Sequence, residues 1–205
     1  MSEPTYTENI ERYSPTYKEY IVPSFVDAVE TIITHDEQPK ERFILLDIDG
    51  VLLENIDKVP VYSLLNRSRI NDINQTHIMY LKEIYNDNLA IVTDRNPKLN
   101  LFLSSKYIVE KVKEVNIPTE QPIPIFHSLN KQFCTICKEK KDEVVQYIAM
   151  KLKNKDEIIL TSIEDDTFTV PNRDIFLLYI AKELYRKQRI KCDIENYVVK
   201  KTRMV

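Results

Sequence analysis

Glycine is almost absent from this chain of 205 residues, because Gly50 is the only one. Tryptophan is missing, and cysteine occurs three times, which is too few for a disulfide framework and favours reduced thiols. No apolar run approaches the roughly 20 residues that a membrane-spanning helix needs. Residues 1–15 also lack the basic and then apolar pattern of a secretory signal. We therefore expect a cytoplasmic protein with no membrane partner.

The composition is that of an ordinary globular chain, with 43% hydrophobic and 30% charged residues. The net charge of −3 hides an asymmetry, since residues 1–41 are acidic and the stretch from Lys182 onward is basic. We interpret that stretch as a solvated basic helix followed by an irregular tail, with contact to a polyanion as the alternative. The expected organisation is an N-terminal arm and helix in residues 1–40 and one main domain in residues 41–205.

Apolar strands alternate with helical patterns along the chain. Residues 1–22 hold several tyrosines among polar residues, which predicts an irregular arm packed by its aromatic rings. From Ser24, apolar residues recur at helical spacing, and residues 42–48 suit a strand buried on both faces. We expect further strands at 89–93, 123–126 and 157–163, and further helices at 76–85, 99–115, 140–153 and 173–188. This alternation predicts an α/β fold with a parallel sheet flanked by helices.

Polar side chains follow the expected strands, at the edge where an open parallel sheet binds ligands. They are Asp47 and Asp49, Thr93 to Asn96, His127 and Ser128, and Glu164 to Asp166. Asp47 and Asp49 are two residues apart, so on an extended chain they face the same side and repel each other without a cation. Oxygen ligands of this kind suit Mg²⁺, with Asp165 or Asp166 as a third carboxylate.

Gly50 follows this acidic pair directly. A residue without a side chain permits a tight turn after the strand and lets a substrate or the main chain come close. The spacing excludes a calcium loop of the EF-hand type, which needs its glycine at the sixth position. The Cys134–Cys137 pair lacks two further ligands for zinc, so we assign it no metal or redox role.

The sequence also contains four ordered motifs: "ILLDIDGV", then "AIVTD", then a lysine that opens "KKDEVVQYI", then "IILTSIEDD". This series, from about residue 42 to residue 166, resembles the haloacid dehalogenase-like (HAD) phosphohydrolases. The resemblance implies a Rossmann-like catalytic domain with Mg²⁺ as cofactor. Residues 52–88 would form the insertion that carries a cap in this family, and their shortness implies a small or absent cap.

The resemblance also implies a role for each matched residue. Asp47 would be the nucleophile that forms an aspartyl-phosphate, and Asp49 would act as general acid and then as general base. Thr93 would bind the transferring phosphoryl group, and Lys141 would offset its negative charge. Asp165 would hold Mg²⁺ together with Asp47 and the backbone carbonyl of Asp49.

Several assignments stay open at this point. Lys131, Lys138 and Lys140 compete with Lys141 for the lysine role, and Asp166 competes with Asp165, because the fourth motif has Glu164 where many members have glycine. Consecutive aspartates here are similar to the branches that act on nucleotide or polynucleotide phosphates.

The expected function is hydrolysis of a phosphomonoester, on a small molecule or on a nucleic-acid end. Arg95 follows Thr93 closely at the end of its strand, so it is a candidate for substrate contact. The alternative is a non-catalytic protein that binds phosphate or nucleic acid on the same scaffold. The sequence does not specify the oligomeric state.

Overall fold

One parallel sheet organises the protein. The computed structural model describes residues 13–35, 41–48, 50–52, 72–86, 88–93, 123–127, 138–165 and 170–200. These residues form six strands: β1 (Thr16–Val22), β2 (Glu41–Leu46), β3 (Leu89–Thr93), β4 (Ile125–His127), β5 (Glu157–Asp165) and β6 (Lys191–Val199). The order across the sheet is β1-β6-β5-β2-β3-β4, and every neighbouring pair is parallel. The predicted α/β fold with a parallel sheet is therefore confirmed.

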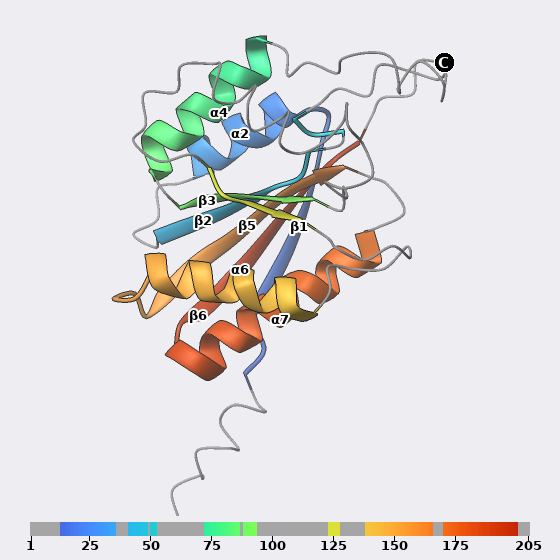
Figure 1. The fold of residues 1–205 in the computed structure, drawn as a ribbon. Helices are drawn as coiled ribbons and strands as arrows, with labels where there is room; N and C mark the ends of the chain where they lie inside the picture. The colour runs from blue at the N-terminus through green and yellow to red at the C-terminus, as the bar shows by residue number, and fades with distance from the viewer. Residues whose placement is uncertain are drawn as a thin grey trace, which may run out of the picture.

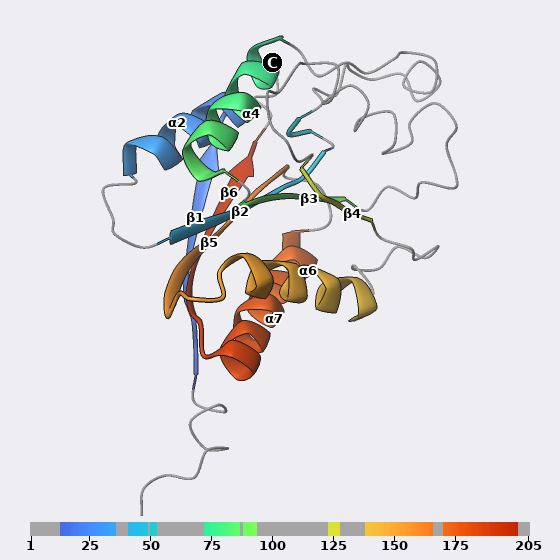
Figure 2. The ribbon, with the colours of Figure 1, turned by 60° about the vertical axis from the view of Figure 1, so that its left-hand side comes forward.

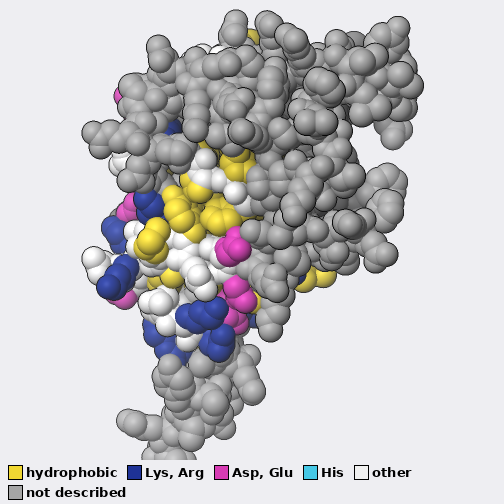
Figure 3. Space-filling view, viewed as in Figure 1, with side chains coloured by type: hydrophobic (Ala, Val, Ile, Leu, Met, Phe, Trp, Pro, Cys, Tyr) yellow, Lys and Arg dark blue, Asp and Glu magenta, His cyan; other side chains and the backbone are white. Residues whose placement is uncertain are grey.

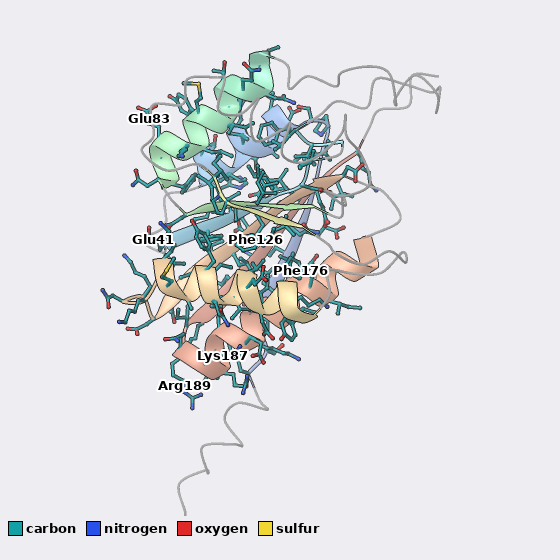
Figure 4. All side chains as sticks on the ribbon, viewed as in Figure 1. Glu41, Glu83, Phe126, Phe176, Lys187 and Arg189 are labelled. Atoms are coloured by element: carbon teal, nitrogen blue, oxygen red, sulfur yellow. The ribbon has the colours of Figure 1, made fainter. Side chains whose placement is uncertain are left out.

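Helices cover both faces of the sheet. They are α2 (Phe25–His35), α4 (Asp72–Tyr85), α6 (Lys138–Lys151) and α7 (Val170–Gln188). Helices α2 and α4 lie on one face, and α6 and α7 lie on the other (Figures 1 and 2). Each face has its own apolar core, which we call the α2–α4 cluster and the α6–α7 cluster. Figure 4 labels Phe176 of α7, a member of the second cluster, and Phe126 of β4, which is partly buried and packs against it.

The sequence patterns account for most of these elements. In α2, the Ser24 hydroxyl accepts a hydrogen bond from the Asp27 amide at 3.2 Å and so caps the helix, while Phe25 and Ile32 are buried. In β2, five of the six residues are buried, as a strand covered on both faces requires. The described part of the predicted insertion 52–88 is chiefly α4, which packs on the sheet beside α2. The expected helix at 99–115 lies outside the described residues.

Element boundaries differ from the prediction by a few residues. Helix α4 begins at Asp72, four residues before the expected start, and β5 continues past 163 to Asp165. The short strand β4 covers residues 125–127, one residue beyond the expected end at 126. The extension of β5 matters for function, because it makes Asp165 the last residue of a strand that is buried from Ile158 onward.

The prediction of an irregular basic tail is wrong for the residues that form β6. This strand lies between β5 and β1, and eight of its nine residues are at least partly buried. Cys192 and Ile194 belong to the α6–α7 cluster, whereas Tyr197 and Val199 belong to the α2–α4 cluster. The charged residues between them hid this alternation in the sequence, although one of them, Glu195, is paired with a buried arginine, Arg42, at 2.7 Å.

The prediction of an irregular N-terminal arm is also wrong for residues 16–22, which form β1. This strand is at the edge of the sheet and pairs with β6 from Thr16↔Asp193 to Val22↔Val199. Most of its side chains are exposed or only partly buried, so its apolar pattern is weak. The tyrosines do pack, as expected: Tyr20 stacks on Tyr197 with 4.8 Å between ring centroids.

The basic residues at the end of α7 are largely paired with acids. Arg186 bonds Glu183 at 2.8 Å, and Lys187 lies 3.4 Å from Asp142 of α6. Figure 3 shows dark-blue Lys and Arg side chains near magenta Asp and Glu side chains on one face of the molecule, and Figure 4 marks Lys187 and Arg189 at this end. This pairing offsets part of the positive charge at the end of α7.

Tyr13 fastens the chain before β1 to the start of β6. Its hydroxyl accepts a hydrogen bond from the Cys192 amide at 2.6 Å and donates one to the Cys192 carbonyl at 3.1 Å. Its ring stacks on Tyr185 of α7 at 4.1 Å. Burial raises the pKa of Tyr13 to about 12, so its folded-state proton is held more tightly than in the unfolded chain.

Replacing Tyr13 by phenylalanine should therefore lower the free energy of unfolding by about 1–2 kcal/mol at pH 8, because two hydrogen bonds are lost. An unfolded tyrosine loses its proton near pH 10, whereas Tyr13 keeps it to about pH 12. The stabilisation by Tyr13 is thus complete below pH 10 and falls as the pH rises to 12. Urea unfolding followed by circular dichroism at pH 8 to 11.5 should show that the difference in free energy of unfolding between the wild type and Tyr13→Phe becomes smaller as the pH rises.

The matched control is Tyr80→Phe, since Tyr80 is 54% exposed on α4. The free energy of unfolding of Tyr80→Phe should equal that of the wild type at each pH of the series. A gap between Tyr13→Phe and wild type that stays constant from pH 8 to 11.5 would contradict this account.

Candidate active site at the carboxyl ends of the strands

Asp47 follows the central strand β2 directly. Its amide donates a hydrogen bond to the Ile163 carbonyl of β5 at 3.0 Å, so the backbone is still held to the neighbouring strand. Its Oδ1 accepts a hydrogen bond from the Ile48 amide at 2.7 Å, which orients the carboxylate. The residue is half-buried. Asp47 is therefore an oriented carboxylate at the carboxyl ends of the strands, where an open parallel sheet is expected to bind a ligand.

Apolar side chains anchor the turn that follows Asp47. Ile48, Val51 and Leu52 are buried in the α2–α4 cluster. From α4, Asn74 donates hydrogen bonds through Nδ2 to the carbonyls of Val51 at 3.3 Å and Leu52 at 3.2 Å. Asn74 is itself buried, so these bonds replace water for both partners. The turn is thus held by packing and by a side-chain amide.

Gly50 lies directly against the side chain of Asp165 at the end of β5. A Cβ atom built on Gly50 would lie 2.4 Å from Asp165 Oδ2, 2.6 Å from its Cβ and 2.8 Å from its Cγ. Gly50 also has a φ of +75°, a backbone conformation that L side chains rarely adopt. Both observations explain why the one glycine of the chain stands here. The group that comes close in the structure is the Asp165 side chain, and the approach of a substrate to Gly50 stays a prediction.

The strands around β2 bring the other predicted residues to the same edge. Leu46 is in register with Ile91 of β3 and with Ile163 of β5. Thr93 and Asp165 each come two residues later, at the ends of their strands. Asp165 is 4% exposed. The side chain of Thr93 lies outside what the structure describes.

Three other predicted site residues, Asp49, Arg95 and Asp166, lie outside the described residues. The described residues therefore hold two of the four predicted metal carboxylates, Asp47 and Asp165. In this part of the chain, no group of three or more His, Cys, Asp or Glu side chains is placed to hold a metal ion. The oxygen donors that are described are of the type that Mg²⁺ prefers. Asp49 comes two residues after Asp47, and Asp166 directly follows Asp165.

Lys141, predicted to offset phosphoryl charge, is described in contact with α7. Its Nζ lies over the ring of Tyr179, 5.6 Å from the centroid. The Tyr179 hydroxyl donates a hydrogen bond to Asp142 at 2.8 Å, and burial followed by this bond raises the pKa of Tyr179 to about 12. Lys138 and Lys140 belong to the same helix, but their side chains, like Lys131 as a whole, lie outside the description. The catalytic role of Lys141 stays a prediction.

Sequence reasoning did not identify Asn74. Asn74, Ile78, Leu81 and Tyr85 lie on the buried side of α4 at spacings of four and three residues. An asparagine within an apolar helical stripe is the signal that would have identified it. The predicted helix began at residue 76, which left Asn74 out.

Comparison of the chain with protein-family models, with curated proteins and with solved structures finds no match. In the parts of the chain that the structure describes, none of the helices combines the length and the apolar character needed to cross a membrane.

Replacing Gly50 by alanine should destabilise the protein by at least about 1 kcal/mol, because the new Cβ collides with Asp165 and the positive φ is unfavourable for alanine. Thermal or urea unfolding of Gly50→Ala measures this loss. A double-mutant cycle with Asp165→Gly separates the two causes, since the glycine removes the colliding side chain and leaves only the backbone strain. Equal losses in both backgrounds would show that Gly50 does not pack on Asp165.

Proposed function

We propose that this chain is a Mg²⁺-dependent phosphatase that hydrolyses a phosphomonoester through an aspartyl-phosphate on Asp47. The observation that carries the proposal is the packing of Gly50 against the Asp165 side chain. This contact joins the first and the fourth of the motifs that resemble those of HAD-like phosphohydrolases, although they are distant in the chain. The same sheet edge also receives Thr93 from the second motif.

The reaction requires a nucleophile and one group that exchanges a proton. In the first step an Asp47 oxygen attacks phosphorus, the bond from phosphorus to the leaving oxygen breaks, and Asp49 gives that oxygen a proton. In the second step a water molecule attacks phosphorus while Asp49 takes its proton. The bond between phosphorus and Asp47 then breaks, which releases phosphate and restores the Asp47 carboxylate and the protonated Asp49.

The environment of Asp47 suits this role. The hydrogen bond from the Ile48 amide fixes the carboxylate relative to the strand end, which reduces the freedom lost when the phosphoryl group is attacked. The residues that would hold Mg²⁺ are Asp47, the Asp49 carbonyl, and Asp165 or Asp166. When bound, the ion would neutralise negative charge on the phosphoryl oxygens and on the carboxylates around it.

The substrate class is a phosphomonoester of a small molecule or of a nucleic-acid end. Thr93 and Arg95 are the residues that we assign to contact with the phosphoryl group and the rest of the substrate. Two basic residues of the stretch that favoured nucleic acid in the sequence, Arg186 and Lys187, are paired with acids in the structure. The consecutive carboxylates at Asp165 and Asp166 remain as support for nucleotide phosphates.

Replacing Asp47 by asparagine should lower phosphate release by at least about 1,000-fold, because the nucleophile is lost. The measurement is release of phosphate from an aryl phosphate, nucleotides and 3′- or 5′-phosphorylated oligonucleotides, with Mg²⁺ or with EDTA. The matched control is Asp156→Asn, which changes an exposed aspartate just before β5 and should keep activity within about threefold of the wild type.

Release that persists in EDTA or in Asp47→Asn would contradict the proposed chemistry. If no compound releases phosphate although the folded protein binds Mg²⁺, the result would favour the alternative, a non-catalytic protein that binds a phosphorylated partner at this edge.

A further inference from the structure

A second buried polar group lies immediately behind Asp165. Glu164 precedes Asp165 in β5 and is only 1% exposed. Because side chains alternate along a strand, Glu164 lies on the α6–α7 face of the sheet, whereas Asp165 lies on the other face beside Gly50. Burying a carboxylate is unfavourable unless hydrogen bonds replace water, so the partners of Glu164 are informative.

Hydrogen bonds connect Glu164 to two further strands. Asn196 of β6, which is fully buried, donates through Nδ2 to Glu164 Oε1 at 2.6 Å and to the Tyr17 hydroxyl of β1 at 3.2 Å. The Tyr17 hydroxyl donates its own hydrogen to Asp174 Oδ1 of α7. The amide uses both of its N–H groups and the tyrosine uses its single O–H, so the direction of every bond is consistent.

Tyr17 keeps its proton under ordinary conditions. Burial, followed by the hydrogen bond to Asp174, raises the pKa of the Tyr17 hydroxyl well above its usual range. The hydroxyl therefore remains a donor to Asp174 and an acceptor for Asn196 throughout the pH range of a phosphatase assay.

The bonds fix both ends of the connection that follows Asp165. Glu164 belongs to β5 and Asp174 belongs to α7, and residues 166–169, which include the alternative metal ligand Asp166, join these two elements. Asp165 is the last residue of β5 and pairs with Val199 at the end of β6. A strand end held only by its backbone is prone to fraying, whereas the Glu164 side chain ties this end to β6.

We propose that Tyr17, Asn196 and Glu164 are positioning residues, which hold Asp165 in the orientation that binds Mg²⁺. This inference rests on the proposed function. Glu164 and Asp165 share one backbone unit, so anchoring the first on one face of the sheet sets the direction of the second on the other. Gly50 packs against the Asp165 side chain and so restricts its position. Partners behind a metal ligand commonly change metal affinity when they are removed.

The test compares two tyrosine variants. Tyr17→Phe removes the hydroxyl that joins Asn196 to Asp174. Its matched control is Tyr197→Phe, because the Tyr197 hydroxyl also bonds a carboxylate, that of Glu195 at 3.4 Å, but lies outside the hydrogen bonds behind Asp165. Calorimetric titration with Mg²⁺ and the Mg²⁺ dependence of phosphate release are measured for both variants and for the wild type.

Tyr17→Phe should raise the Mg²⁺ concentration for half-saturation about tenfold, with kcat at saturating Mg²⁺ within about threefold of the wild type. Tyr197→Phe should stay within about twofold in both quantities. If Tyr17 had a purely structural role, Tyr17→Phe would lower the free energy of unfolding but would bind Mg²⁺ with the same affinity as Tyr197→Phe.

A second pair of variants tests Glu164 directly. Glu164→Gln keeps an oxygen that accepts the Asn196 hydrogen bond and should retain most of the Mg²⁺ affinity, whereas Glu164→Leu should lose it. Equal Mg²⁺ affinities for Tyr17→Phe and Tyr197→Phe would overturn the inference and leave the phosphatase intact. Failure of the wild-type protein to bind Mg²⁺ or to release phosphate would overturn the proposed function, and the inference with it.

Discussion

The contact between Gly50 and Asp165 is the constraint on which the site depends. At this contact, the turn after β2 and the end of β5 approach each other so closely that no Cβ atom would fit between them. Such a contact is possible only if both backbones are fixed. The turn is fixed by Ile48, Val51 and Leu52 in the α2–α4 cluster and by the hydrogen bonds from Asn74. The end of β5 is fixed on the opposite face through Glu164.

The order of the strands explains why these supports come from the ends of the sequence. Strand β2 lies between β5 and β3, so the candidate nucleophile is at the centre of the sheet. Strand β5 in turn needs a neighbour on its other side, which β6 supplies, and β1 covers β6. Tyr17, Tyr13 and Tyr20 attach β1 to α7 and β6 through hydrogen bonds and ring stacking. The N-terminal tyrosines therefore belong to the framework of the site.

The sequence predicts the elements that bury apolar residues at regular spacing. It misses a strand whose buried residues include polar ones and a strand at the edge of the sheet. Strand β2 and helix α2 have apolar residues at regular spacing, so pattern alone identifies them. Strand β6 was missed because Glu195 and Asn196 interrupt its apolar residues, and their partners Arg42 and Glu164 are distant in the chain. Strand β1 was missed because an edge strand has little to bury. At the site, the tight turn at Gly50 could be predicted from the sequence, whereas Asn74 and the partner of Gly50 could not, because they depend on tertiary packing.

Fluorine NMR of the protein with beryllium fluoride tests the central claim most directly, because this anion forms an adduct with an aspartate carboxylate that mimics an aspartyl-phosphate. Our account predicts bound fluorine signals that require Mg²⁺ and that disappear in Asp47→Asn. The absence of bound signals in the wild type, or their persistence in Asp47→Asn, would contradict the claim that Asp47 accepts a phosphoryl group beside Gly50 and Asp165.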